Sequence, residues 1–139
     1  MTLLNNLQET ENLAVEIAKK VKNGGIILLS GNLGSGKTTF TQLLAKKLGL
    51  NDFSIKSPTY TYIREHQLPG RKFYHLDLYR INDQDLINQE VRELIENTGD
   101  IIIIEWSEKL NFTITRPKIE ILLEYIDPTT RKATINETL

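Results

Sequence analysis

The sequence predicts an α/β fold with a mainly parallel sheet that is covered by helices on both faces. Two uninterrupted apolar runs, at residues 26–29 and 101–104, are typical of strands buried on both sides. Segments with apolar residues at helical spacing alternate with the predicted strands, which is the pattern of parallel sheets. With 139 residues, 40% of them hydrophobic, the chain is expected to form one domain over residues 1–139.

The N-terminal part of the chain is expected to run helix, strand, helix. Thr10 is the expected N-cap of the first helix, because apolar residues recur at helical spacing after it as far as the glycine pair at 24–25. Residues 26–30 then form a buried strand. The next helix includes residues 43–48 and is expected to end at Gly49.

Two further strands are predicted in the middle of the chain, over residues 59–65 and 72–79. The Pro-Gly pair within residues 68–71 predicts a turn between them. The two strands are therefore expected to pair as an antiparallel hairpin at one edge of the sheet.

The C-terminal part begins with a helix that Asp83 or Asp85 is expected to cap. Residues 101–104 give the second buried strand. Apolar residues alternate with polar ones over 119–125, as in a half-exposed strand, and the turn at 127–130 leads into a last strand.

Residues 31–38, Gly-Asn-Leu-Gly-Ser-Gly-Lys-Thr, match the P-loop pattern of glycine, four residues, glycine, lysine and serine or threonine. Glycines let the backbone turn its N–H groups toward phosphate oxygens, and the following helix adds the positive end of its dipole. In this pattern Lys37 reaches the β- and γ-phosphates, and the Thr38 hydroxyl binds Mg²⁺. The predicted fold is therefore a P-loop NTPase-like three-layer sandwich.

Two carboxylates follow predicted strands and are candidates for the metal and for the attacking water. Glu105 comes directly after the apolar run 101–104, as a Walker B residue does, and Asp77 lies near the end of the strand 72–79. Because the carboxyl ends of parallel strands meet at one edge of the sheet, both are expected beside the loop.

Composition excludes several other classes of site. The chain has no cysteine and two histidines, so disulfides, iron–sulfur clusters and zinc sites built on Cys or on several His are ruled out. The net charge of -1 argues against a broad nucleic-acid or membrane surface. No apolar run approaches the roughly 20 residues of a membrane span, and no secretory signal is recognisable, so a cytoplasmic protein is expected.

Four short motifs stand in a fixed order along the chain, and together they resemble the TsaE family, also called YjeE, of small bacterial P-loop ATPases. The two middle motifs and the Glu-Trp pair of the last one make the resemblance specific, since the P-loop alone occurs in many families. The motifs are GNLGSGKTT (31–39), KSPTYT (56–61), YHLDLYR (74–80) and IEWSEK (104–109).

The resemblance implies a function that spacing alone does not give. Members of this family bind ATP and Mg²⁺ and act with the TsaB–TsaD complex in forming threonylcarbamoyladenosine in tRNAs that read codons beginning with A. The family does not carry out the transfer itself, and tRNA is met indirectly through that complex. We therefore expect a weak, partner-dependent ATPase.

The resemblance also implies roles for individual residues. Thr38 and Glu105 are expected to hold Mg²⁺, and Lys37, Asp77 and Glu105 to serve in catalysis. Asp77 is expected to position water or to support the metal site from outside it, and residues 7–10 to lie where the family approaches adenine. The residues expected to bind the nucleotide are Gly34, Ser35, Gly36, Lys37, Thr38, Thr39 and Arg131.

Other residues have a structural interpretation beside the functional one. Residues 57–59 are expected either to turn into a strand or to sense the γ-phosphate. A lone histidine on a strand, such as His75, is more often packed or hydrogen-bonded than catalytic. Trp106 is expected on the opposite face of its strand from Glu105, where it shields the site, meets a partner or simply packs.

Three other functions compete with the ATPase. A small-molecule kinase is the main alternative, although kinases usually carry an arginine-rich lid that this chain lacks. A GTP-dependent switch commonly uses Asn-Lys-x-Asp to select guanine, and the chain contains no Asn-Lys pair. A nucleotide-dependent binding module differs from the ATPase only in whether hydrolysis matters.

Overall fold

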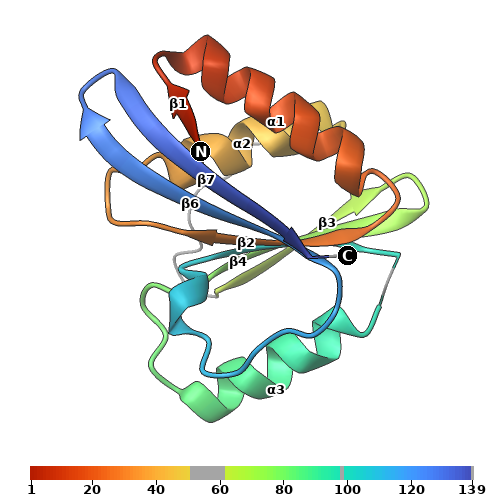
Figure 1. Ribbon diagram of the computed structural model, residues 1–139. Coiled ribbons are helices and arrows are strands. Elements are labelled where there is room, and N and C mark those ends of the chain that lie inside the picture. The colour runs from red at the N-terminus through yellow and green to blue at the C-terminus, as the bar shows by residue number, and fades with distance from the viewer. Residues whose placement is uncertain (51–61, 98, 139) are drawn as a thin grey trace.

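The computed structural model describes residues 1–50, 62–97 and 99–138. Among these residues, seven strands form a single sheet that runs through the middle of the molecule (Figure 1). In the order in which they lie side by side, the strands are β1 (Thr2–Leu4), β7 (Thr130–Thr138), β6 (Lys118–Asp127), β2 (Gly25–Ser30), β5 (Ile101–Glu105), β4 (Arg71–Asp77) and β3 (Ile63–Leu68).

The centre of the sheet is parallel and both of its edges are antiparallel. Strands β6, β2, β5 and β4 run in the same direction, with β2 paired to both β5 and β6. The hairpin β3–β4 forms one edge, as the sequence predicts, and β6, β7 and β1 form an antiparallel arrangement at the other. Strand β1 was not predicted, because three residues are too few to show a period.

Helices cover both faces of the sheet. Helices α1 (Leu7–Val21) and α2 (Lys37–Lys47) lie together on one face, and α3 (Gln84–Ile95) lies on the other (Figure 1). A short 3₁₀ helix, η1 (Ser107–Lys109), follows β5. The mixed α/β architecture with a mainly parallel centre is thereby confirmed.

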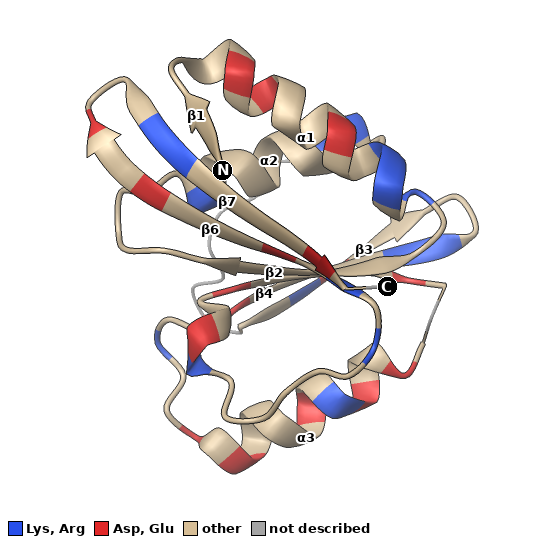
Figure 2. Ribbon diagram, in the orientation of Figure 1, with Lys and Arg blue, Asp and Glu red and all other residues tan. Residues whose placement is uncertain are grey.

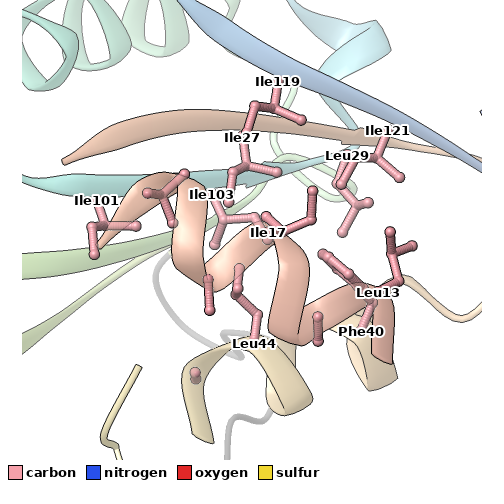
Figure 3. Packing of buried hydrophobic residues seen from close by; sticks show 14 of the residues in the cluster. Leu13, Ile17, Ile27, Leu29, Phe40, Leu44, Ile101, Ile103, Ile119 and Ile121 are labelled. Atoms are coloured by element: carbon pink, nitrogen blue, oxygen red, sulfur yellow. The ribbon is translucent and has the colours of Figure 1, made fainter. Parts of the chain in front are cut away.

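Each face of the sheet has its own hydrophobic cluster. On the α1 face, Ile17 and Leu44 from the two helices point toward Ile27, Leu29 and residues of the neighbouring strands (Figure 3). The residues between these along the same strands, such as Leu28 and Ile104, face the other way and pack against the apolar side of α3. The predicted central strands are buried on both sides for this reason, and the polar residues at their ends are fixed in place.

The first helix begins earlier than the sequence predicted. Asn6 is its N-cap, with the Asn6 side chain accepting a hydrogen bond from the N–H of Glu9 at 2.9 Å. The prediction that Thr10 caps this helix is wrong. Thr10 lies inside the helix, and its N–H donates to the carbonyl oxygen of Asn6 at 3.3 Å. None of the residues of the first turn is buried, and the buried apolar residues begin only at Leu13, so apolar periodicity could not reveal the start of the helix. For α3, Asp83 is confirmed as the cap, since its side chain accepts the N–H of Leu86 at 3.0 Å.

The edge hairpin also differs in its limits. Pairing between β3 and β4 continues to Leu68 and Arg71, so the strand extends to Leu68 and not to residue 65. Strand β4 ends at Asp77 and not at residue 79, because the Asp77 side chain accepts the N–H of Tyr79 and turns the chain. Residues 51–61 lie outside the described residues, and with them the prediction for residues 57–59.

Charged residues of both signs are distributed over the helices and strands (Figure 2). Helix α1 carries Glu9 in its first turn and Lys19 and Lys20 in its last, which complements the helix dipole. Among the described residues, none of the helices has the length and apolar character needed to cross a membrane.

Candidate functional site

The glycine-rich loop, residues 31–38, runs from the end of β2 into the first turn of α2, and its glycines at 31, 34 and 36 all have positive φ. Gly31 has φ +136°, and a Cβ there would lie 2.1 Å from the carbonyl oxygen of Leu123 in β6. Gly36 adopts the left-handed conformation with φ 100° and is the N-cap of α2, with no side-chain cap hydrogen bond. The N–H groups of the first turn of α2 have no partner within the helix and so are available to an anion.

The ammonium of Lys37 is drawn back into this loop. Its Nζ donates to the carbonyl oxygen of Gly31, to that of Asn32 at 2.9 Å and to the Ser35 hydroxyl at 3.4 Å. The residue is 6% exposed. The loop therefore presents a fixed positive charge at its centre.

Burial lowers the pKa of Lys37, and three carboxylates oppose this effect. Glu108 raises the pKa most, followed by Glu105 and Asp77. The two strand-end carboxylates that the sequence singled out are therefore both close enough to Lys37 to act on its charge.

Glu105, the last residue of β5, is 2% exposed and has two side-chain neighbours. Its Oε1 accepts a long hydrogen bond from the hydroxyl of Thr38 at 3.5 Å. Its Oε2 is hydrogen-bonded to Nε2 of His75, a fully buried residue of β4. A packed or hydrogen-bonded His75 agrees with the expectation from the sequence, whereas its partner Glu105 was not predicted.

Asp77 lies directly beside Glu105, since the two are paired in the register of β4 and β5. It is half-buried, and its Oδ1 accepts the N–H of Tyr79 at 3.0 Å. Both carboxylates are thus at the edge of the sheet that carries the loop, in the arrangement that the sequence predicts for parallel strands.

Two residues of the 104–109 motif also reach the loop. Trp106 packs against the α3-side cluster, on the face opposite Glu105, but its ring centroid also lies 4.1 Å from Nζ of Lys37. Its backbone is left-handed, with φ 60°, at the point where β5 has ended and η1 begins. Glu108 accepts the N–H of Gly31 at 3.3 Å. A role for Glu108 was not predicted from the sequence, although its place in that motif was an available signal.

Arg131, in β7, lies on the other side of the loop. Its Nη1 donates to the carbonyl oxygens of Asp127 at 2.8 Å and Thr130 at 3.1 Å, and its guanidinium lies 4.8 Å from the Tyr125 ring. A Cβ built on Gly36 would be 3.9 Å from its Nε. The structure thus places Arg131 against the loop, as the sequence led us to expect.

A cavity of about 390 Å³ opens between the N-terminal segment, the loop and the β6–β7 turn. Its walls combine apolar side chains with hydroxyl and amide groups and one guanidinium. They are Leu4, Asn6, Leu7, Thr10, Ser35, Gly36, Thr39, Leu123, Pro128, Thr129 and Arg131. Of the expected nucleotide-binding residues outside the loop, Leu7, Thr10 and Thr39 line this cavity, whereas Gly34 of the loop itself is exposed and does not.

The donor set at Thr38 and Glu105 fits a hard divalent cation. A hydroxyl and a carboxylate oxygen face each other at 3.5 Å, and oxygen ligands of this kind are what Mg²⁺ prefers. Mg²⁺ is usually held by one or two carboxylates, with water and substrate phosphates as its other ligands. The positive loop beside these oxygens is where such phosphates would bind.

Comparison with protein families identifies one match that spans most of the chain. Residues 4–133 match the family described as threonylcarbamoyl adenosine biosynthesis protein TsaE. Among curated proteins, the tRNA threonylcarbamoyladenosine biosynthesis protein TsaE of Rickettsia felis is 37% identical over 135 residues, covering 97% of this chain and 78% of the relative. The protein of the same name from Nostoc sp. is 38% identical over 133 residues, covering 92% of this chain and 80% of its own.

Among solved structures, the crystal structure of Bacillus subtilis YdiB is similar to this one. The TM-score is 0.71 and the sequences are 28% identical, with 96% of this chain and 82% of that chain covered. The two chains therefore share their fold over nearly the whole of the present sequence.

Proposed function

Because this chain belongs to the TsaE family of threonylcarbamoyl adenosine biosynthesis proteins, we propose that it is a Mg²⁺-dependent ATPase that acts with the TsaB–TsaD complex. In this proposal the fold is a P-loop NTPase-like three-layer sandwich, and the protein works in the cytoplasm and meets tRNA through its partners. The observation that carries it is the glycine-rich loop, which holds the Lys37 ammonium at its centre and sets the Thr38 hydroxyl against the Glu105 carboxylate.

The loop would hold the triphosphate. The phosphate oxygens accept hydrogen bonds from backbone N–H groups between Gly34 and Thr39, and the ammonium of Lys37 neutralises the β- and γ-phosphates. Burial of that ammonium strengthens its attraction for phosphate, because less water screens it. Arg131 adds a second positive charge from the β7 side of the loop.

Thr38 and Glu105 would hold Mg²⁺ between them. When bound, Mg²⁺ supplies charge that stabilises the developing negative charge on the transferred phosphoryl group. Glu105 suits this task because its carboxylate is buried and fixed from two sides.

Asp77 would orient the attacking water. It is the second carboxylate at this edge, it is half-exposed, and one of its oxygens is already engaged by the N–H of Tyr79. The site is open at this carboxylate and does not exclude bulk water. These features support slow hydrolysis by the protein alone.

The 390 Å³ cavity would take the adenine and ribose. It adjoins Ser35 and Gly36 of the loop, and its apolar walls suit a flat base whose edges need a few polar partners. Residues 7–10 then contribute to nucleotide binding, as the family resemblance implies.

The partner complex would complete the site. Charge stabilisation supplied by another protein is worth several orders of magnitude in phosphoryl transfer, for example about 10³–10⁵-fold from one arginine. The test is to titrate TsaB–TsaD into a steady-state ATPase assay at fixed ATP and Mg²⁺, with a sizing column run in parallel. We expect the rate to rise with the partner concentration and an ATP-dependent complex to elute. A flat rate without any complex contradicts the proposal.

The kinase remains the second candidate because a separate cavity of about 240 Å³ lies beside Glu108. Its lining includes Ser30 and Ser107 along with Glu108, so a polar acceptor could lie near the loop. Phosphate transfer from ATP to small hydroxyl-bearing acceptors, with no stimulation by TsaB–TsaD, would favour this candidate over the ATPase.

A further inference from the structure

His75 is buried within the site and is hydrogen-bonded to Glu105, one of the two proposed ligands of Mg²⁺. It lies on β4, is 0% exposed, and its Nε2 is hydrogen-bonded to Oε2 of Glu105 on the adjacent strand. In the register of the two strands His75 pairs with Ile103, so its ring reaches along the sheet to the next residue on the same face. The strand pairing therefore fixes the ring against the carboxylate.

The position of the proton on His75 follows from its surroundings. An ionised carboxylate accepts hydrogen bonds and cannot donate them, so the proton of this bond belongs to Nε2. Among the described residues, Nδ1 of His75 is buried without a hydrogen-bond partner. The hydrogen-bond pattern therefore fits an imidazole that donates from Nε2 to Glu105.

This bond divides the two oxygens of Glu105 between two neighbours. Oε2 is taken by His75, and Oε1 faces the Thr38 hydroxyl at 3.5 Å. Resting on the proposed function, we propose that His75 is a positioning residue that leaves Glu105 a single oxygen for the cation, and that it thereby favours Mg²⁺ over Ca²⁺.

The two cations differ in what they require of a carboxylate. Mg²⁺ is small, takes six ligands in a near-ideal octahedron, and keeps several waters. Ca²⁺ takes about six to eight oxygen ligands and often uses both oxygens of one carboxylate. A carboxylate with one oxygen held by His75 still offers Mg²⁺ a single oxygen, but it hinders Ca²⁺ from using both oxygens.

Loss of the histidine would also free the carboxylate to turn. Hydrogen bonds from outside a metal site fix the orientation of its ligands, and removing one typically costs about 10–100-fold in metal affinity. Without the hydrogen bond from His75, Glu105 would bind Mg²⁺ more weakly, while Ca²⁺ would gain access to Oε2, the second oxygen of the carboxylate. The ratio of the two effects separates this role from a purely structural one.

The experiment compares two amides at position 75. The side chain of His75→Gln is long enough to bring an N–H near the position of Nε2, whereas that of His75→Asn is one methylene shorter and stops short of Glu105. Calorimetry measures the affinity for the β,γ-imido analogue of ATP in Mg²⁺, in Ca²⁺ and in EDTA, and thermal unfolding is followed for each variant. His66→Gln and His66→Asn, on the neighbouring strand β3, are the matched controls.

We expect His75→Asn to lose about tenfold or more of the affinity gained with Mg²⁺ and to lose less of the gain with Ca²⁺. Its affinity in EDTA should be unchanged, and His75→Gln should restore the wild-type ratio. An unchanged Mg²⁺-to-Ca²⁺ ratio in His75→Asn, or an equal loss in EDTA, overturns the inference while leaving the proposed function standing. Wild-type protein that fails to bind the analogue under all three conditions overturns both.

Discussion

Asp77 and Glu105 are neighbours in the register of two parallel strands, yet their surroundings differ. Glu105 is 2% exposed and is held by the side chains of Thr38 and His75. Asp77 is half-exposed and is bonded to the backbone of its own turn, through the N–H of Tyr79. The two carboxylates lie at equivalent strand ends but suit different roles. Glu105 is suited to hold a cation rigidly, and Asp77 is suited to contact water.

The largest effect is expected from removing the buried charge. Glu105→Gln keeps the shape of the side chain but loses its negative charge, so we expect the Mg²⁺-stimulated ATPase rate to fall by roughly 10³-fold, the upper range for one electrostatic group. Rates are measured with TsaB–TsaD present, over a series of Mg²⁺ concentrations. Glu16→Gln, at an exposed position of α1, is the control. A wild-type rate in Glu105→Gln would abolish the distinction between the two carboxylates.

A smaller effect, confined to turnover, is expected at the neighbouring position. Asp77→Asn should lower the ATPase rate by about 10²-fold, the lower range for a group that handles a proton, because its water-facing carboxylate is lost. Affinity for Mg²⁺-ATP should stay within about twofold of wild type, since the site for the cation is intact. Calorimetry and steady-state rates are compared for the same preparation. The same profile in Asp77→Asn and Glu105→Gln would show that the two residues share one role.

The smallest effect is expected from the third carboxylate near Lys37. Glu108 is exposed, and its charge both supports the ammonium and repels phosphate. Glu108→Gln should therefore change the affinity for Mg²⁺-ATP by no more than about fivefold, because exposed charge pairs contribute roughly 0–1 kcal/mol. The difference should shrink further at high salt. A loss comparable to that of Glu105→Gln would make Glu108, and not Glu105, the main acidic partner of the loop.

The sequence predicted which residues gather at the edge of the sheet, because local patterns carry that information. The apolar runs place β2 and β5 in the middle of the sheet, and Asp77 and Glu105 follow from the strand ends. The glycine-rich loop is recognisable from its own residues. The family resemblance then accounts for Arg131, which no local pattern would connect to the loop.

What the sequence could not predict depends on contacts between distant segments. The bond between His75 and Glu105 joins residues 30 positions apart and requires β4 to lie beside β5 in one particular register. Gly31 is needed because the backbone of Leu123 passes close to it, which depends on the pairing of β2 with β6. Asn6 as the cap of α1 could not be predicted because the buried apolar residues of the helix begin only at Leu13.

The central claim is that the loop around Lys37 binds the phosphates of ATP, and calorimetric titration of Mg²⁺-ATP into Lys37→Ala tests it most directly. Lys46→Ala, at the exposed far end of α2, is the matched control. We expect the control to bind as the wild type does and Lys37→Ala to lose roughly 1.5–3 kcal/mol, the worth of a hydrogen bond to a charged group. Equal affinities in Lys37→Ala and the wild type would contradict the account.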